Sequence, residues 1–480
     1  MPEMRWKKKK TVAEFLRDIQ AREEKHRKKW NSLQIMVPGF LGIILLGAFL
    51  LMLPVSNADG QWLKFTDALF TACTSVCVTG LVTVVPAVQF TLFGKIIMLL
   101  LIQIGGWGVI VCIMWVLVLL KRRITLNARV IIRDYFNMDT MSGLVRMLIY
   151  VVKASLVVEG IGAVCYGFYF VPCYGFLRGC WYSIFHSVSA FCNAGIDILG
   201  DSSLARFQGN PWINLVTILL IVLGGLGFMV WRDLTAFLKN VFVKKEKLRK
   251  AVRETHLQTK IVVVMTGVLL IAGTLLVFAM EHNNPETLGS LPLWKKWMAS
   301  LFQSVTTRTA GFFTMSQEGL REGTKLICCI FMFIGGSPVG TAGGVKTVTV
   351  AVLLLTCWSI LKGHRDTECF QRKIADSTVR MAVVVFAAEL LLTLGGTILL
   401  SVLEPEISVM EGLYEVVSAT ATVGLTAGIT PELSVPGKYV IIILMYLGRI
   451  GPITLPMMMA AKLGKKNDKR TLPVEHIVVG

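Results

Sequence analysis

The chain has 480 residues, of which 54% are hydrophobic and only 16% are charged, and its formal net charge is +19. A soluble protein of this length carries roughly a quarter charged residues, so the composition excludes an ordinary soluble protein. The positive charge alone would suit nucleic-acid binding, but its distribution along the chain argues against that class.

The first 30 residues are polar and basic. They include four consecutive lysines at 7–10, and no apolar segment with a cleavage site lies directly behind them. A cleaved signal peptide needs both features. We therefore expect residues 1–30 to form a basic cytoplasmic tail.

Eight predominantly apolar runs follow this tail, and each is long enough to cross a bilayer as a helix of about 20 residues. A soluble domain has no room to bury eight helices that are apolar all round. The sequence therefore predicts an all-α integral membrane protein. The runs are Ile35–Leu53, Leu92–Leu120, Leu144–Phe170, Trp212–Trp231, Ile261–Met280, Leu326–Leu361, Val379–Leu403 and Tyr439–Leu463.

The basic residues concentrate on one side of these runs. Of the 49 Lys and Arg, 36 fall in five short segments, at 1–30, 121–146, 232–260, 362–380 and 462–470. The segments that alternate with them are neutral or acidic, such as 404–415. The positive-inside rule then places both termini and three loops in the cytoplasm. The expected contacts of this basic surface are anionic lipids or an acidic partner, and not nucleic acid.

A similar segment recurs between the two apolar runs of each pair. Each copy is rich in Ser, Thr, Ala and Val and has a glycine at or near its end, at Phe70–Leu81, Phe185–Ile196, Phe302–Phe312 and Tyr414–Leu425. These loop glycines, Gly80, Gly195, Gly311 and Gly424, are 115, 116 and 113 residues apart. A second marker follows each one by 24 to 29 residues, at Gly105-Gly106, Gly224-Gly225, Gly335-Gly336, and Gly448 with Gly451. Two markers in step indicate an internal repeat.

Each repeat reads as a first helix, a re-entrant half-helix, a loop and a second helix. Non-helical backbone at membrane depth is tolerated only when it is buried in protein or lines a water-filled cavity. We therefore expect four such units, with eight transmembrane helices and four half-helices, around one pseudo-fourfold pore. The predicted units are 31–122, 143–240, 257–362 with a broken second helix, and 376–463, and a cytoplasmic tail follows at 464–480.

The residues around the loop glycines suit a dehydrated monovalent cation. Rings of backbone carbonyls replace the water shell of potassium in potassium channels, and glycine permits the backbone angles that such a ring requires. The half-helices would aim their negative C-terminal ends at the ion. The predicted potassium-binding filter comprises Val78, Thr79, Gly80, Asn193, Ala194, Gly195, Thr309, Ala310, Gly311, Thr422, Val423 and Gly424.

Charged residues near these loops allow two interpretations. Asp197 follows the second loop, and Glu404, Glu406, Glu411 and Glu415 precede the fourth. They either concentrate cations at the outer mouth or are ordinary solvated loop charges. Arg308 lies three residues before Gly311 and would repel potassium if it faced the ion. We expect its side chain to point behind the filter and brace neighbouring polar groups.

At these residues the chain resembles the Trk/Ktr/HKT superfamily of potassium transporters, and most of all the Ktr-type bacterial membrane subunit. The closest text match is VTTRTAGF at Val305–Phe312. The resemblance implies potassium uptake across the plasma membrane. It also implies preference for potassium over sodium, because the first loop has a glycine, Gly80, where some plant members carry serine.

The resemblance implies a gate in the helix after the third loop, within Gly335–Thr347. The glycines and the proline of this segment would weaken a helix in any protein. Many relatives carry Gly-Ser where this chain has Val339-Gly340. The predicted gate residues are Gly335, Gly336, Ser337, Pro338, Gly340, Thr341, Gly343, Gly344 and Lys346, and for Lys346 snorkelling to the membrane surface is an alternative.

Family members also carry a positive residue in the last span, and Arg449 matches it. An arginine within an apolar helix is a functional candidate by default. The resemblance implies that Arg449 faces the pore below the filter as an electrostatic barrier, or anchors the gate. A brace between helices to Glu159 or Glu389 is the alternative.

The resemblance further implies a homodimer and a separate cytoplasmic ring of nucleotide-binding regulatory subunits. Potassium is expected as the transported ion, sodium as a possible coupling or activating ion, and no bound cofactor is expected. The six His show no catalytic arrangement, so an enzyme is not predicted. Two alternatives stay open: a sodium-permeable or less selective monovalent cation transporter, and a secondary transporter for another solute. Whether transport is channel-like or a symport also stays open.

Overall fold

The computed structural model describes residues 32–120, 143–200, 202–245 and 247–451, together with 129 and 133. These residues are mostly helical, with one small antiparallel hairpin of β1 (Glu368–Cys369) and β2 (Arg372–Lys373). The predicted tails at 1–30 and 464–480, and the predicted end of the last unit at 452–463, lie outside the described residues.

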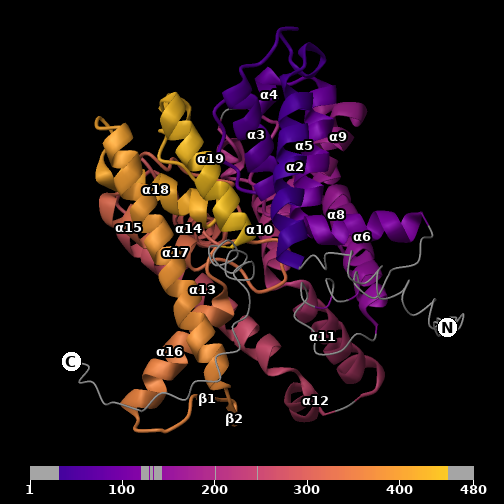
Figure 1. Ribbon diagram of the computed structural model, residues 1–480, viewed down its shortest axis with the longest axis vertical. Helices are drawn as coiled ribbons and strands as arrows, with labels where there is room; N and C mark the ends of the chain where they lie inside the picture. The colour runs from indigo at the N-terminus through magenta and orange to yellow at the C-terminus, as the bar shows by residue number, and fades with distance from the viewer. Residues whose placement is uncertain are drawn as a thin grey trace, which may run out of the picture.

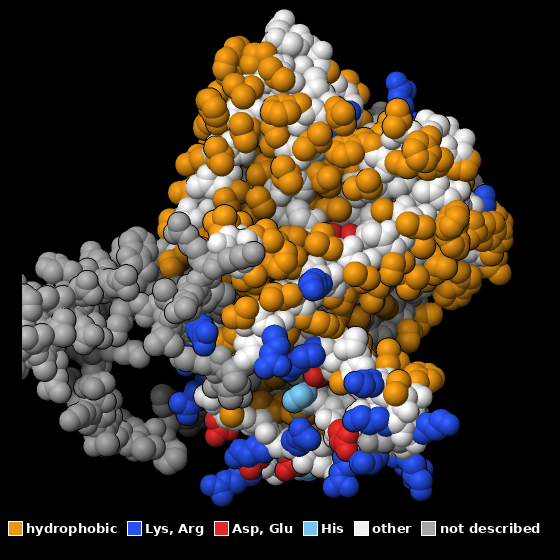
Figure 2. Space-filling model, turned by 90° about the vertical axis from the view of Figure 1, so that its right-hand side faces the viewer, with side chains coloured by type: hydrophobic (Ala, Val, Ile, Leu, Met, Phe, Trp, Pro, Cys, Tyr) orange, Lys and Arg blue, Asp and Glu red, His pale blue; other side chains and the backbone are white. Residues whose placement is uncertain are grey.

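Four long helices begin the four predicted units. They are α2 (Ser32–Met52), α8 (Leu144–Tyr174), α13 (Leu257–Glu281) and α17 (Asp376–Leu403). All four are long and apolar enough to cross a membrane, yet only 28% to 33% of their most apolar windows is buried inside the protein. Their exposed side chains are large and apolar, as at Leu46, Val157 and Leu391. These faces suit contact with lipid tails, and Figure 2 shows apolar side chains covering most of the visible surface above a basic end.

A short helix follows each long one. These short helices are α3 (Phe65–Cys77), α9 (Phe176–Phe191), α14 (Leu293–Thr306) and α18 (Val409–Thr420). At 12 to 16 residues they are too short to span a bilayer. Their C-terminal halves are buried on every side, for example over residues 70–77 and 414–420. Burial on every side accounts for the small Ser, Thr and Ala residues there, because neighbouring backbones approach closely.

The second helices of the units differ from the prediction, which placed a break only in unit three. In unit one, α5 (Leu92–Trp107) and α6 (Val109–Leu119) meet at a bend of 101°, and in unit two α10 (Pro211–Leu226) meets the helix that begins at Phe228, α11 (Phe228–Leu238), at 104°. The bends lie at Gly108 and Gly227, whose φ angles are +84° and +87°. Positive φ is readily adopted only by glycine, so these residues end one helix and redirect the chain.

In unit three the second helix is split into α15 (Glu322–Phe333) and α16 (Thr347–Leu361), and unit four ends its described part with α19 (Val435–Ile450). Counting each bent pair as one span, up to six spans of the described residues have membrane-crossing length and composition. The split second helix of unit three, α15 and α16, is not among them, and neither is the described part of the second helix of unit four, α19. The remaining short elements are η1 (Pro54–Ser56), α4 (Pro86–Gln89), η2 (Ala205–Phe207), η3 (Lys239–Val243, a π-helix), α12 (Leu248–Glu254) and η4 (Thr430–Glu432).

The units pack in a closed cycle. The second helix of each unit contacts the short helix of the next: α5 packs on α9, α10 on α14, and α15 on α18. The cycle closes because α19 of unit four contacts α3 of unit one. In Figure 1 α11, α12 and the hairpin lie toward the lower end of the molecule.

Candidate functional site

The four glycine loops share an unusual backbone conformation. The residue two positions before each glycine has positive φ, with values of +56°, +59°, +65° and +51° at Val78, Asn193, Thr309 and Thr422. The glycines themselves have φ of +104°, +66°, +79° and +95°, and the residue between has no positive φ. Positive φ at β-branched Val and Thr costs of order 1–3 kcal/mol for each residue, and such strain clusters at functional sites.

The loops converge on one another in the order of the units. An added Cβ atom at Gly80 would lie 2.7 Å from the carbonyl oxygen of Ala194, and one at Gly195 would lie 2.6 Å from that of Ala310. An added Cβ at Gly311 would lie 2.6 Å from the Val423 carbonyl oxygen, and one at Gly424 would lie 2.1 Å from the Thr79 carbonyl oxygen. Each glycine therefore faces a carbonyl of the next loop, and the fourth faces the first. These contacts bring together eight of the twelve residues predicted for the filter, namely the four glycines and the residue before each of them; the other four have positive φ in the same loops.

Serine and threonine side chains hold the loops to the ends of their short helices. The Gly80 N–H donates to Thr74 Oγ1 at 2.9 Å, and the Gly424 N–H donates to Ser418 Oγ at 3.0 Å. In the other two loops the hydroxyl donates to the carbonyl just after the glycine, from Ser189 to Ile196 and from Thr306 to Phe312. The Ser/Thr-rich text of the repeat is thus explained by bonds within each loop.

The second glycine marker lets the short helices touch the second helices. An added Cβ at Gly105, Gly224 or Gly448 would lie 2.1, 2.0 or 1.9 Å from the carbonyl oxygen of the residue four positions before a loop glycine, namely Val76, Phe191 or Thr420. No side chain fits at these contacts. Three residues further along, Gly108, Gly227 and Gly451 all have positive φ. The repeated G-x-x-G spacing was the signal for the breaks in units one and two that our sequence analysis missed.

Residues 334–346 between α15 and α16 form no helix, and we call them the unit-three loop. Backbone hydrogen bonds close its base, among them Gly335 N to Val345 O at 3.0 Å and Gly336 N to Gly343 O at 3.2 Å. All nine predicted gate residues lie within this loop.

The tip of the unit-three loop, Ser337–Ala342, is bonded to the break in unit two. The Ser337 N–H donates to the Gly225 carbonyl at 3.0 Å, and the Phe228 N–H donates to the Val339 carbonyl at 3.0 Å. The Thr341 hydroxyl donates to the carbonyl of Phe191, the last residue of α9, at 3.2 Å. The break at Gly227 therefore supplies the free backbone groups on which the tip rests.

Arg449 joins this tip to unit one. Its Nη1 donates to the Thr341 carbonyl at 2.6 Å and its Nη2 to the Gly105 carbonyl at 2.5 Å. Lys346 Nζ donates to Ala342 O at 2.8 Å, within its own loop, so its ammonium does not snorkel outward. Arg449, Lys346 and Glu389 all line one cavity of about 360 Å³. Glu159 instead accepts a hydrogen bond from Gln103 Nε2 at 2.9 Å.

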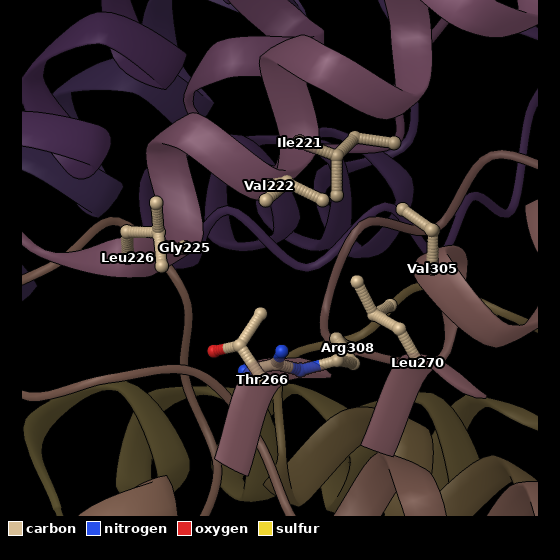
Figure 3. A pocket seen from close by; sticks show the side chains of 8 residues that line it. All are labelled: Ile221, Val222, Gly225, Leu226, Thr266, Leu270, Val305 and Arg308. Carbon is tan, nitrogen blue, oxygen red and sulfur yellow. The ribbon is translucent and has the colours of Figure 1, made fainter. Parts of the chain in front are cut away.

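Arg308 points away from the ring, as expected. Its buried side chain lines a small cavity of about 10 Å³ between α10, α13 and α14, and Figure 3 shows the guanidinium near Thr266. The expected bracing of polar neighbours is absent for Nε of Arg308, which has no hydrogen-bond partner among the described residues, and the same holds for Thr266 Oγ1.

The acidic residues near the fourth loop divide into two groups. Glu404, Glu406 and Glu411 line an outer cavity of about 710 Å³, together with Glu318 and Glu432, which our sequence analysis did not single out. Glu415 is fully buried and accepts a hydrogen bond from Thr430 Oγ1. It is therefore neither a mouth residue nor a solvated loop charge, which corrects both interpretations of that residue.

Comparison with known proteins agrees with this architecture. The family model described as "TrkH: Cation transport protein" matches residues 16–469. The chain is 37% identical to the potassium/sodium uptake protein NtpJ of Enterococcus hirae over 95% of this chain and 98% of that protein. It is 36% identical to Ktr system potassium uptake protein B of Vibrio alginolyticus, over 91% of this chain and 93% of that one. The crystal structure of the potassium transporter TrkH from Vibrio parahaemolyticus superposes with a TM-score of 0.68 at 18% identity, covering 89% and 86% of the two chains.

Proposed function

This chain belongs to the TrkH family of cation transport proteins, and from that premise we propose that it carries potassium into the cell through one pore on the axis of its four units. It is a multi-pass membrane protein and a transporter, not an enzyme. The ring of four glycine loops carries the proposal. Alternating backbone angles and the contacts between successive loops suit a filter of backbone carbonyls around a dehydrated cation.

We place the gate in the unit-three loop. Within its tip, the Thr341 hydroxyl donates to the Phe191 carbonyl at the end of the short helix of unit two, and Arg449 of unit four donates to the Thr341 carbonyl. A guanidinium below the filter also raises the energy of a passing cation, because like charges repel strongly in a medium of low polarity. Arg449 thus has two roles in this proposal, as an electrostatic barrier and as the anchor of the gate.

We propose the orientation in the membrane from the distribution of basic residues, and the partners from the similarity to the Ktr proteins. Both termini and the basic loops face the cytoplasm of a cell whose plasma membrane holds the protein, in agreement with the basic end below the apolar surface in Figure 2. The Ktr relatives are named as parts of a system. We propose a homodimer of this chain that works with a cytoplasmic nucleotide-binding ring, with potassium as substrate and sodium as a coupling or activating ion.

The test is cation flux into liposomes that hold the purified protein, with potassium, rubidium, sodium and lithium compared in turn. We expect potassium and rubidium to pass well and sodium and lithium poorly. In Gly80→Ser the new side chain meets the Ala194 carbonyl at 2.7 Å and must displace a filter loop. We expect the preference for potassium over sodium to fall about tenfold, equivalent to 1.4 kcal/mol.

The matched control is Gly60→Ser, because Gly60 also has positive φ but nothing lies within 4 Å of an added Cβ. This variant should keep the wild-type preference. Sodium passing as well as potassium in the unmodified protein would favour the sodium-permeable alternative, which the name of the Enterococcus relative also suggests. A complete lack of monovalent cation flux, with or without a cytoplasmic partner, would refute the pore.

Val339 gives a prediction with a definite sign. It holds φ of +58° in the loop tip, where many relatives have glycine, and its carbonyl accepts from Phe228 N. Left-handed backbone costs an L-residue roughly 1–2 kcal/mol. Val339→Gly removes this cost in the conformation seen here. We expect potassium flux to fall about 5- to 30-fold, since 1.4 kcal/mol is a factor of ten.

The control for this prediction is Val339→Ala, which shortens the side chain but keeps most of the backbone strain. Its flux should stay within a factor of about three of the wild type. Flux that rises in Val339→Gly would mean that the tip conformation described here is not the one that blocks the pathway.

A further inference from the structure

We propose that Glu389 is a positioning residue of the gate, and that its carboxylate is a second binding place for the Lys346 ammonium when the unit-three loop leaves the pathway. The inference rests on the proposed function, because it concerns how that gate moves. Three charged side chains that line one cavity carry the inference. Two of them, Lys346 and Arg449, donate hydrogen bonds to backbone carbonyls, whereas Oε1 of the third, Glu389, has no hydrogen-bond partner among the described residues.

The cavity lies beside the loop tip, with Val339, Gly340 and Ala342 among its lining residues. It measures about 360 Å³ and is lined by the loop itself, by the break of unit one and by α17 and α19. The charged groups that line it are Lys346, Glu389 and Arg449. A cation that has passed the filter therefore meets two positive side chains and one negative one. This space is large enough for side chains to exchange partners without rearranging the helices.

The Lys346 side chain is hydrogen-bonded to its own loop. Its ammonium donates to the carbonyls of Ala342 at 2.8 Å and Gly343 at 3.4 Å. The same Gly343 carbonyl also accepts from Gly336 N across the base of the loop. Lys346 therefore draws the end of the tip back onto the base, in the conformation whose tip is bonded to the break in unit two.

Glu389 lines the same cavity as Lys346. Its side chain is only 2% exposed, and Oε1 has no hydrogen-bond partner among the described residues. Buried carboxylates on other first helices are satisfied: Glu159 accepts from Gln103, and Glu281 accepts from Asn284 and Thr287. A buried carboxylate oxygen without a hydrogen-bond partner is costly to keep. Lys346 and Glu389 line the same cavity and are not hydrogen-bonded to each other. The Glu389 carboxylate is therefore a second possible partner for the Lys346 ammonium.

Moving Lys346 from the loop carbonyls to Glu389 would change two things together. It would remove the side-chain bonds that hold the tip against the base, which frees the loop to move. It would also pair one of the two positive charges in the cavity, which lowers the repulsion that a passing cation meets. The two loop conformations then differ in the partner of one ammonium group. Such a choice between discrete partners is how a packed interior switches.

The test is a double-mutant cycle on potassium flux in liposomes. Glu389→Gln keeps the shape of the side chain and removes its charge, and we expect it to lower flux about tenfold because Lys346 loses its second partner. Lys346→Met should raise flux, since the tip loses its bonds to the ammonium. In the Lys346→Met background, Glu389→Gln should change flux by less than about twofold, so that the two effects are coupled. Lys346→Gln serves as the second background if the methionine variant does not fold.

The matched control is Glu159→Gln. Glu159 lies 36 residues before its loop glycine and Glu389 lies 35 before its own, so both carboxylates sit at corresponding places in their units. Glu159 does not line the cavity of Lys346. Its substitution should combine additively with Lys346→Met.

Two outcomes would overturn the inference. If Glu389→Gln lowers flux as much in the Lys346→Met background as alone, then Glu389 acts on the passing cation directly and not through Lys346. If Glu389→Gln leaves flux unchanged, the carboxylate has no part in gating. Both outcomes require that the unmodified protein transports potassium, whereas failure of the proposed function would show as no flux in the unmodified protein.

Discussion

Replacing Gly424 with alanine is expected to abolish potassium flux, with a loss of at least about 100-fold, more than 2.7 kcal/mol. An alanine Cβ at this position would lie 2.1 Å from the Thr79 carbonyl oxygen and 2.8 Å from the Gly80 Cα. Both are backbone atoms of the neighbouring filter loop, so neither can rotate away as a side-chain end does. Gly424 also has φ of +95°, which alanine adopts only with strain.

The four loop glycines should not respond equally. The nearest backbone oxygen to an added Cβ is at 2.7 Å for Gly80, 2.6 Å for Gly195 and Gly311, and 2.1 Å for Gly424. Alanine should therefore be least harmful at Gly80 and most harmful at Gly424. Flux in liposomes is the measurement, with the melting temperature in detergent as a check that each variant folds.

Two glycines of the first helices provide controls. Nothing lies within 4 Å of an added Cβ at Gly267 on α13 or at Gly395 on α17. Both positions lie in helices, where alanine is favourable. Gly267→Ala and Gly395→Ala should transport like the unmodified protein. A Gly424→Ala protein that folds and transports normally would show that the ring is not part of the ion pathway.

The repeat could be read from the sequence because glycine spacing reflects close backbone contacts. The loop glycines and the second marker recur with nearly the same spacing in the sequence. In the structure the four loop glycines, and one glycine of each second marker, lie where a backbone oxygen leaves no room for Cβ, as between Gly105 and Val76. Only glycine fits at a contact of this kind. The spacing of the glycines can therefore be recognised in one sequence without an alignment.

The breaks at Gly108 and Gly227 were missed for the opposite reason. The segments around them, such as Val109–Leu119, are as apolar as a continuous span, and hydropathy does not distinguish a straight helix from a bent one. The direction of the second half is set by tertiary contacts, above all by the unit-three loop that rests on the break in unit two. Only the recurring G-x-x-G spacing marked these positions.

Glu389 could not be assigned a role from the sequence either. A single Glu in an apolar helix marks a functional candidate, but its partner depends on which side chains share its cavity. Glu159 reads the same in the sequence and turns out to be bonded to Gln103. The difference between the two carboxylates lies in the packing of distant segments, which no local pattern contains.

Replacing Arg449 with glutamine is expected to raise potassium flux about tenfold or more in the protein without its partner. The arginine makes two charge-assisted hydrogen bonds, to the Thr341 carbonyl at 2.6 Å and to the Gly105 carbonyl at 2.5 Å. A hydrogen bond to a charged group is worth about 1.5–3 kcal/mol, so losing these bonds weakens the attachment of the loop tip considerably. Removing the charge also lowers the repulsion of a cation below the filter.

Arg449→Lys separates these two contributions, because lysine keeps the charge but does not present the guanidinium fork that reaches two carbonyls on different units. Its flux should lie between those of the wild type and Arg449→Gln. Arg146→Gln, which removes an exposed arginine at the start of α8, should change nothing. If Arg449→Gln folds but transports less than the wild type, the guanidinium supports the open pathway. Arg449 would then favour the open pathway, as the strain at Val339 does, although the two residues act at different contacts of the loop tip, at the Thr341 carbonyl and at the Val339 carbonyl.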